Sequence, residues 1–501
     1  MNYKNYFILI VALFLYIKAY AQTQSIAYSS VGKGVATTFV TDYHCLGINS
    51  SALGWGTGYE RKKITTGSSE FSLGIYSDNL SSDNLKKLYR SVKDNVLKKS
   101  ISSSDLNTQR EAVANYAQAG ISIFADFNWL GFAYQGKRFG GIAFNINESY
   151  SFNTKLNQTT TDLIFRGKLA NYFDSLTIVF GTDTTNIKNS NNLSSDSLNH
   201  VISGSIGVPL KLSSITNGSN IQLLWNRSYN FGYGRKIIGI DSIIEIYGGV
   251  GVRYIQSMAM FNLTSNQEGL KMYSSITPSF NVNYGSIANL NPSNYNVSNG
   301  VLPKSVGNGY GIDLSASIIL FKKLKVALAV NNLGNVTYTR NVYQVRDTLL
   351  GNISLSGLNN YDITHSVNQL VQSNGILKLV GTEKYVLNNA SNIRFGASFQ
   401  PFKFIHFGFD IIAPFRKDTP GSIQNSVFSF GGEIRVLKRI ALSVGYFGGG
   451  IYQNNIPVGI NFILKDGKYE FGISSRDALR FFTPSKGHSL STAFGFARFR
   501  F

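Results

Sequence analysis

Residues 311–330 read GIDLSASIILFKKLKVALAV, two alternating stretches joined by a short basic turn. In the first stretch Ile312 and Leu314 share one face, and Asp313 lies on the other. The same alternation resumes after the turn at 321–323. Because successive side chains of a β-strand point to opposite faces, this pattern predicts a hairpin with one apolar and one polar face.

The alternation recurs down to the last residue, so that residues 311–501 read as nine strands. Tight turns fall near 322, 401, 438 and 466, and longer loops fall at 334–390, 415–426, 448–455 and 476–489. Tight turns and long loops therefore alternate, and every tight turn lies on the same side as the C-terminus. That arrangement is typical of an outer-membrane β-barrel, which has short periplasmic turns and long extracellular loops.

The last stretch, residues 492–501, reads TAFGFARFRF. Phe499 and Phe501 share one face, and Arg498 and Arg500 share the other. A final strand that ends on an aromatic residue resembles the signal by which outer-membrane barrels are recognised for insertion. We therefore expect the barrel-assembly machinery to be a partner, reached through the strand that ends at Phe501.

Charged residues of the predicted strands fall on the face opposite the apolar stripe. A charge that faces lipid costs about 2–4 kcal/mol at the membrane midplane, so charges gathered on one face indicate a wet interior. The alternative is the solvent face of a soluble sheet. The candidate lumen-lining residues are Asp126, Glu245, Arg253, Asp313, Arg394, Asp410, Glu433, Arg435, Arg498 and Arg500.

The composition of the 501 residues agrees with a barrel and excludes a bundle of membrane helices. Hydrophobic residues make up 43% and the mean hydropathy is −0.03, whereas each membrane helix needs about 20 consecutive apolar residues. The 49 Gly, 35 Phe and 28 Tyr beside only 9 Pro suit strands and interfacial aromatic girdles. The single cysteine, Cys45, excludes a disulfide framework.

The N-terminus reads as a secretory signal peptide over residues 1–21. Lys4 precedes an apolar run at 7–17, and Ala19-Tyr20-Ala21 is a small-x-small cleavage site. The alternative, a transmembrane anchor, needs a longer run. Loss of Lys4 and Lys18 would reduce the net charge from +20 to +18. Export predicts location in the cell outer membrane, with lipid and lipopolysaccharide as partners, and argues against a nucleic-acid partner despite the positive charge.

Several segments interrupt the strand pattern. Residues 82–118 carry an apolar stripe at helical spacing and predict two helices, and 161–173 predict a third. These helices would pack over a barrel mouth or inside the lumen, or form a lid or plug that gates ligand entry. Residues 334–390 predict a long extracellular loop and 184–199 a polar loop. The stretch 241–264 is too long for one ordinary strand, and the strand parity between 241 and 310 stays open.

Residues 31–54, VGKGVATTFVTDYHCLGINSSALG, resemble the N-terminal segment of the FadL-like barrels, the long-chain fatty-acid transporters. They are similar also to PorV-type barrels, and most to an uncharacterised barrel family of Bacteroidota. Asn49, Ala52, Leu53 and Gly54 match an Asn-Pro-Ala-x-Leu-Gly element, although the proline is missing and one residue is added.

Two shorter motifs support the same resemblance, FGYGRK followed by GVGVRYI within residues 231–255, and NNLG at 331–334. The resemblance implies an all-β membrane protein, an antiparallel transmembrane barrel of about 14 strands (range about 12–16) with small helical insertions. It also implies an inward, hatch-like N-terminal segment over residues 22–52, with the barrel at 53–501.

No catalytic constellation is visible. The five histidines are scattered, without His-Glu-x-x-His or paired metal spacing, and no Gly-x-Ser-x-Gly elbow occurs. We therefore predict no enzyme, no cofactor and no metal site.

Two functions remain open. The first is a passive outer-membrane channel or transporter for a small-molecule ligand. The FadL-like resemblance implies a hydrophobic ligand for it, while the mixed polar lining suits small polar solutes. The second is a non-transporting binding or assembly subunit, as the resemblance to the secretion-associated PorV-type barrels implies. In that case residues 82–118 and 334–390 would be partner surfaces.

Overall fold

A computed structural model gives the fold. It describes residues 27–501 apart from 60–61, 81–113, 137, 191–192, 241–242, 297–301, 356, 358–375, 418, 424, 451–453 and 479–487. The predicted signal peptide and most of the predicted helical segment 82–118 lie outside the described residues. Of that segment, residues 114–118 are described, and they are helical.

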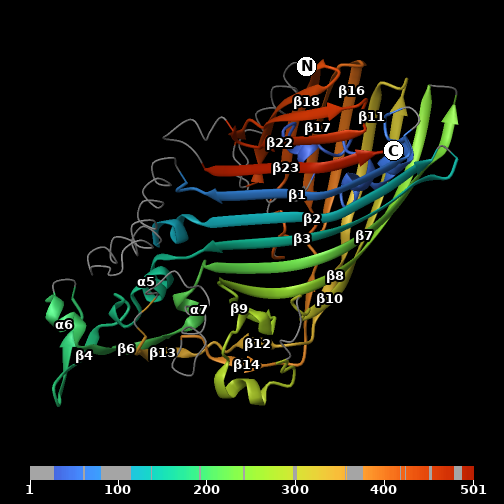
Figure 1. The fold of residues 1–501 in the computed structure, drawn as a ribbon. Coiled ribbons are helices and arrows are strands. Elements are labelled where there is room, and N and C mark those ends of the chain that lie inside the picture. Colours follow the sequence, from blue (N-terminus) through green and yellow to red (C-terminus); the bar gives the residue numbers. More distant parts are fainter. Residues whose placement is uncertain are drawn as a thin grey trace, which may run out of the picture.

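Among the described residues, fourteen antiparallel strands pair in a closed ring, which confirms the predicted barrel (Figure 1). The last strand closes the ring onto the first, where Phe71 pairs with Phe494. The nine strands predicted between 311 and 501 are all present. The barrel strands are β1 (Ile64–Ser77), β2 (Ile121–Gly136), β3 (Gly140–Lys155), β7 (Asn220–Ile240), β8 (Ile244–Asn266), β10 (Gly307–Leu320), β11 (Leu324–Tyr338), β16 (Asn392–Phe402), β17 (Ile405–Pro414), β18 (Val427–Leu437), β19 (Ile440–Gly449), β21 (Val458–Leu464), β22 (Tyr469–Ser475) and β23 (Ser489–Arg500).

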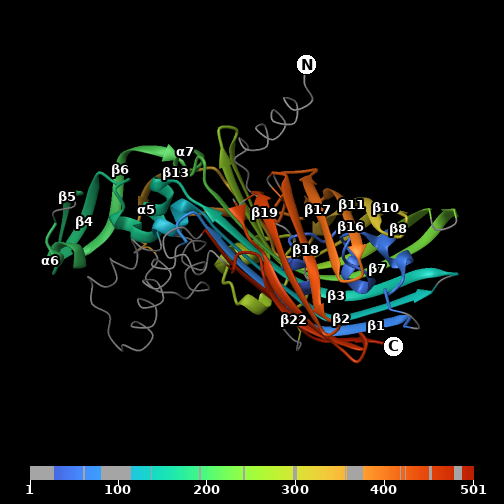
Figure 2. The same cartoon turned by 90° about the horizontal axis from the view of Figure 1, so that it is seen from above.

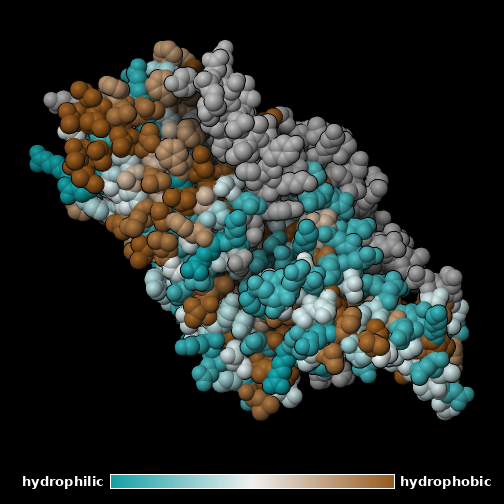
Figure 3. Space-filling view, turned by 180° about the vertical axis from the view of Figure 1, so that it is seen from behind, coloured by the Kyte–Doolittle hydropathy of each residue, from teal (hydrophilic) through white to brown (hydrophobic). Residues whose placement is uncertain are grey.

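The two faces of the barrel wall differ in polarity, as the alternation predicts. In β10 the outward Leu314 is 50% exposed, whereas the inward Asp313 is 4% exposed. Outward phenylalanines of β16, β17 and β18, such as Phe395, Phe409 and Phe430, are likewise exposed. Figure 3 shows apolar side chains gathered toward one end of the molecule. An apolar outer wall around a polar interior is the arrangement that suits a bilayer.

Among the helices of the described residues, none is long and apolar enough to cross a membrane.

Beyond the end of the barrel opposite the tight turns, the chain builds a second layer of structure (Figures 1 and 2). β8 runs for 23 residues and pairs past the barrel wall with β9, onto which β12 and then β14 are added. A separate four-stranded sheet has the order β13-β6-β4-β5. The elements of this layer are β9 (Gly269–Ile276), β12 (Val342–Val345), β14 (Leu379–Gly381), β15 (Tyr385–Asn388), β4 (Ser175–Phe180), β5 (Asp183–Lys188), β6 (Val201–Lys211), β13 (Leu349–Ile353), α5 (Gln158–Arg166), η3 (Gly167–Leu169), α6 (Ser195–Asn199), α7 (Leu212–Ile215), η4 (Pro278–Phe280) and η5 (Gly285–Leu290).

This outer layer has its own apolar core. Leu163 of α5, Leu212 of α7 and Tyr343 of β12 belong to one buried cluster with Leu263 of β8 and Met272 of β9. The cluster fixes the outer layer to the extended end of β8. β20 (Asn454–Asn455) adds a short pairing to β19.

Four sequence predictions need correction. From Ile244 on, the stretch predicted at 241–264 belongs to one long strand, β8, whose far end pairs outside the barrel. The described part of the segment 334–390 is no simple loop, because β11 continues to Tyr338 and four short strands follow within it. The predicted helix at 161–173 begins earlier and ends at Arg166, where Gly167 has a positive φ of 55°. The polar loop 184–199 contains β5 and α6.

The segment before the first strand lies inside the barrel and comprises α2 (Tyr28–Val31), η1 (Asp42–Cys45) and η2 (Ser50–Trp55). We call residues 27–56 the plug. The chain enters β1 only at Ile64, so the barrel begins later than the predicted position 53. Short 3-10 turns with buried side chains let the plug turn repeatedly within the lumen.

Candidate functional site

The plug touches the whole circumference of the barrel wall. Within the described chain, an inward residue from each of the fourteen strands lies against it. These wall residues are Glu70, Gly131, Asn145, Gly234, Gly249, Ser315, Asn331, Gly396, Asp410, Glu433, Gly445, Gly459, Ser474 and Arg498. The plug therefore closes the lumen at this level rather than lying along one side of it.

Inward glycines make room for the plug backbone. A Cβ at Gly431 would lie 1.9 Å from the carbonyl oxygen of Lys33, and one at Gly249 would lie 2.1 Å from the amide nitrogen of Ser51. Both distances are far shorter than any real contact of a Cβ atom. Glycine is the residue that permits such a close approach of two backbones.

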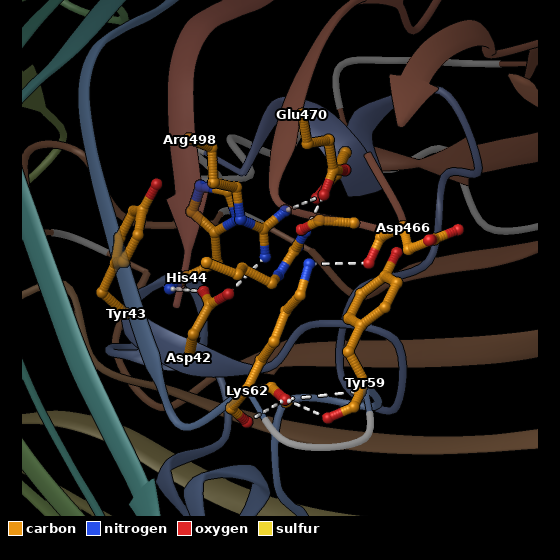
Figure 4. Close-up of polar contacts among 12 residues, drawn as sticks. Asp42, Tyr43, His44, Tyr59, Lys62, Asp466, Glu470 and Arg498 are labelled. Atoms are coloured by element: carbon orange, nitrogen blue, oxygen red, sulfur yellow. Dashed lines mark hydrogen bonds and ion pairs between the residues drawn. The ribbon is translucent and has the colours of Figure 1, made fainter. Parts of the chain in front are cut away.

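Buried ion pairs fix the plug to the last strands (Figure 4). Asp42 accepts from the Nη2 of Arg498 at 2.5 Å, and Arg498 contacts Glu470 at 3.3 Å. Glu470 also accepts from Arg500 at 2.5 Å. All four side chains are almost fully buried. Two arginines and two carboxylates therefore balance one another where the plug meets β22 and β23.

Glu70 of β1 is a second anchor for the plug. It accepts from the Tyr43 hydroxyl at 2.6 Å and from the Asn128 amide at 2.8 Å, and the His44 imidazole lies 2.9 Å away. The alternation of the sequence does not reveal Glu70, because Ser69 has a positive φ of 56° and interrupts the alternation of β1. Burial raises the pKa of Tyr43 well above its usual value, with the Glu70 charge as the next cause, so this phenol stays a donor.

Predicted lumen residues of β17 and β18 also hold the plug. Asp410 accepts from the backbone amides of Ala36 and Thr37 at 2.7 and 2.9 Å. Glu433 pairs with Lys33 of the plug at 2.8 Å and with Arg435 at 3.1 Å. These residues are therefore structural contacts of the plug.

The predicted hatch-like residues lie in the plug. Asn49 donates to the carbonyl oxygen of Thr37 at 2.8 Å, and it accepts from the Ser51 hydroxyl at 2.6 Å. Ala52 and Leu53 are buried in the apolar cluster between the plug and the wall. The position of Gly54 leaves no space for a Cβ, which would lie 2.9 Å from the Arg235 backbone.

The remaining predicted lumen residues lie apart from the ion pairs of β22 and β23. Arg253 pairs with Asp313 at 3.0 Å across β8 and β10. Glu245 accepts from Lys236 at 2.8 Å near the tight-turn end. Arg394 is buried on the inward face of β16. Asp126 lines the lumen beyond the plug, so the predicted residues form several groups and no single site.

On the outer side of the plug, the lumen opens into a cavity of about 770 Å³, which we call the mouth. Its wall carries a band of hydrogen-bonded polar side chains across β2, β3, β7 and β8. Ser122 donates to Asn153 at 2.8 Å, and weaker contacts of 3.4 Å continue to Gln222 and Asn262. Rings of Tyr76, Tyr273 and Tyr385 line the same cavity.

Between the mouth and the plug lie two smaller spaces. The first, the waist, has about 60 Å³ and is lined by Phe124, Leu224, Val336 and Tyr338. The second, the inner compartment, has about 100 Å³. Its lining is rich in asparagine, namely Asn128, Asn145, Asn147, Asn226, Asn230 and Asn332. The lumen thus passes from polar to partly apolar and back to polar before the plug closes it.

Over the described ranges, no cluster of three His, Cys, Asp or Glu side chains could hold a metal ion. Cys45 is buried in the plug, and burial raises the pKa of its thiol well above the usual value. The fold and the lumen together define a transmembrane β-barrel closed by its own N-terminal segment.

Comparison with known proteins adds similarities of fold only. No model of a protein family and no curated protein matches the chain. The fold is similar to the Pseudomonas putida toluene transporter TodX, with 8% identity, coverage of 97% of this chain and 99% of that chain, and a TM-score of 0.41. It is similar to the Ralstonia pickettii toluene transporter TbuX, with 11% identity, coverage of 97% and 100%, and a TM-score of 0.40. A Pseudomonas aeruginosa FadL homologue has 9% identity, coverage of 96% and 99%, and a TM-score of 0.41.

The third of these structures is described as a FadL homologue, and the resemblance of residues 31–54 names the same family. The part of the resemblance that concerns Bacteroidota stays a prediction.

Proposed function

We propose that this chain is an outer-membrane channel for the passive uptake of small molecules, with the plug as its gate. One observation carries the proposal: a lumen open at the mouth leads through the waist to a segment that is held only by non-covalent contacts. The exposed apolar outer wall supports a place in the membrane.

The lining favours molecules with an apolar body and a polar end. Tyrosine rings at the mouth and Phe124, Leu224 and Val336 at the waist offer apolar surface. The Ser122 to Asn262 band and the asparagines of the inner compartment offer hydrogen bonds. The FadL-like resemblance of residues 31–54 agrees with a hydrophobic ligand, and the polar levels extend that class to amphipathic molecules.

A reversible cross-link tests whether the plug is a gate. The hydroxyl oxygens of Ser51 in the plug and Ser317 in β10 lie 2.7 Å apart. In a Cys45→Ser background, the pair Ser51→Cys and Ser317→Cys should form a disulfide that fixes the plug. We expect liposomes holding the purified protein to take up benzyltrimethylammonium and benzenesulfonate, both small aromatic ions, when the pair is reduced. Oxidation should abolish uptake, and a reductant should restore it.

A matched control places the same cross-link away from the plug. Ser175 and Ser205 join β4 and β6 of the outer sheet, with their hydroxyl oxygens 2.8 Å apart. The pair Ser175→Cys and Ser205→Cys should leave uptake unchanged in either redox state. Absence of uptake of both ions by every reduced variant would contradict the channel function.

A non-transporting binding or assembly subunit is the second candidate. Val208 of β6 and Leu349 of β13 are 77% and 63% exposed on the outer sheet, where apolar side chains suit a protein partner. Recovery of a defined complex from outer membranes, lost on Val208→Ser and Leu349→Ser substitution, together with absent uptake, would favour this candidate.

A further inference from the structure

Asp126 is a buried acidic side chain of the lumen that holds no hydrogen bond or ion pair to the described residues of the plug. It is 9% exposed on the inward face of β2, and it lines both the waist and the inner compartment. Among the described residues, no hydrogen bond or ion pair reaches its carboxylate. A buried charge without a partner is costly, so an unpaired carboxylate that faces a cavity indicates a bound group.

The other carboxylates near the inner compartment are compensated. Glu148 pairs with Arg227 at 3.0 Å, and Asp313 pairs with Arg253 at 3.0 Å. Glu70 accepts hydrogen bonds from Tyr43 and Asn128 beside the His44 imidazole. Arg476 lines a narrow space together with Asp126, and its guanidinium also lies over the Phe447 ring, 5.6 Å from the ring centroid. Glu70 and Asp126 are the carboxylates that line the inner compartment, and of these two only Asp126 lacks a hydrogen bond or ion pair among the described residues.

Hydrogen-bond acceptors line the same compartment as Asp126, and the Arg253 guanidinium that also lines it is paired with Asp313. Asn128 donates its amide to Glu70, and Asn230 donates its amide to Asn145, so the carbonyl oxygens of Asn128 and Asn230 are fixed as acceptors. Neither oxygen has a partner among the described residues, and the same holds for the side-chain oxygens of Asn147, Asn226 and Asn332. All five asparagines line the inner compartment. Such a set of oxygens stabilises a positive charge or a group with several N–H donors.

We propose that Asp126 and the asparagine oxygens of the inner compartment form a binding site for a compact, singly charged cation, the primary ammonium end of a transported molecule. One carboxylate matches one positive charge, and a space of about 100 Å³ holds only a small headgroup. Divalent hard cations usually gather more carboxylates than this site offers. The inference rests on the proposed function for access to the site, because the ligand reaches it through the mouth and the waist.

Equilibrium dialysis of labelled methylammonium against the purified full-length protein in detergent tests the site directly. We expect saturable binding of one methylammonium per chain. Asp126→Asn keeps the shape and removes the charge, so it should weaken binding at least about tenfold. Asn226→Leu should weaken binding by a smaller factor. Asp183→Asn, on the exposed outer hairpin, is the matched control and should bind like the parent.

Competition identifies the source of the cation. Unlabelled methylammonium should displace the label, and tetramethylammonium, which lacks N–H donors, should not. Displacement by potassium chloride at equal concentration would assign the same site to an alkali ion and would overturn the ammonium assignment. Absent saturable binding, or equal affinity in Asp126→Asn, would overturn the site itself. The assay needs no transport, so binding without liposome uptake would refute the channel and leave the site standing.

Discussion

At the scale of single residues, the lumen wall is shaped as much by missing side chains as by charged ones. Gly249 and Gly248 are neighbours in β8 and face opposite sides of the wall. A Cβ at Gly249 would meet the Ser51 backbone at 2.1 Å, whereas one at Gly248 would meet the end of the Ile237 side chain at 2.7 Å. A flexible side chain can move aside, but the backbone of a packed plug cannot do so without losing its other contacts.

The first prediction follows from this pair. Gly249→Ala should displace the plug and lower the stability of its docking by about 1–3 kcal/mol, the usual cost of an overpacked contact. Liposome uptake of benzenesulfonate should rise as a result. Gly248→Ala, one residue away, should leave both quantities unchanged. Equal behaviour of the two variants would show that the close approach at Ser51 does not hold the plug.

At the scale of elements, the plug is joined to the barrel by charge as well as by shape. Asp42 and Arg498 are 456 residues apart in sequence, and their buried pair is shared with Glu470. Charge-assisted hydrogen bonds in such surroundings are stronger than neutral ones and are little affected by salt. The plug is therefore an element whose docking, unlike that of most surface loops, responds strongly to single charges.

The second prediction concerns this joint. Asp42→Asn should weaken plug docking by about 1–3 kcal/mol, because one hydrogen bond to a charged group is lost while Arg498 keeps Glu470. Hydrogen exchange of the amides of residues 36–45 should accelerate accordingly, and high salt should not mimic the effect. As a control, Glu268→Gln breaks an exposed contact to Lys271 and should change nothing measurable. Unchanged protection in Asp42→Asn would refute the anchor.

Sequence alternation predicted the barrel strands because the bilayer imposes it residue by residue. The alternating apolar and polar types of Ile312, Asp313 and Leu314 show which face of the strand each side chain lies on, even before the fold is known. The partners of the plug left no such local signal, since Asp42 meets Arg498 and Lys33 meets Glu433 only after the ring has closed. Glu70 was hidden by the irregular backbone at Ser69, and the outer sheet was hidden because its short strands pair with segments far away in the chain.

At the scale of the whole molecule, the outer wall requires apolar side chains and the lumen requires polar ones at alternate positions of each strand. Leu314 is exposed at the middle of β10, and Phe402 is exposed beside a tight turn at the end of β16. In a membrane these two positions would face the hydrocarbon core and the interface, respectively. The cost of a charge differs strongly between those depths.

The third prediction uses that difference. Leu314→Arg should lower the free energy of unfolding from lipid vesicles by about 2–4 kcal/mol. Phe402→Arg should lower the same free energy by only about 0–1 kcal/mol. Urea titration of vesicle-inserted protein, followed by tryptophan fluorescence, gives both values. Similar small costs at the two positions would contradict the placement of Leu314 at the hydrocarbon core and of Phe402 at the interface.

The meeting of the first and last segments also sets an order of assembly. The plug is synthesised before the barrel strands, yet three of its anchors, Asp410, Ser474 and Arg498, belong to strands made late in the chain. Contacts so distant in sequence cannot form until the end of the chain has arrived. In an unfinished barrel the plug therefore cannot close the lumen. The barrel closes by pairing of β1 with β23, and the plug closes the lumen in the same late step.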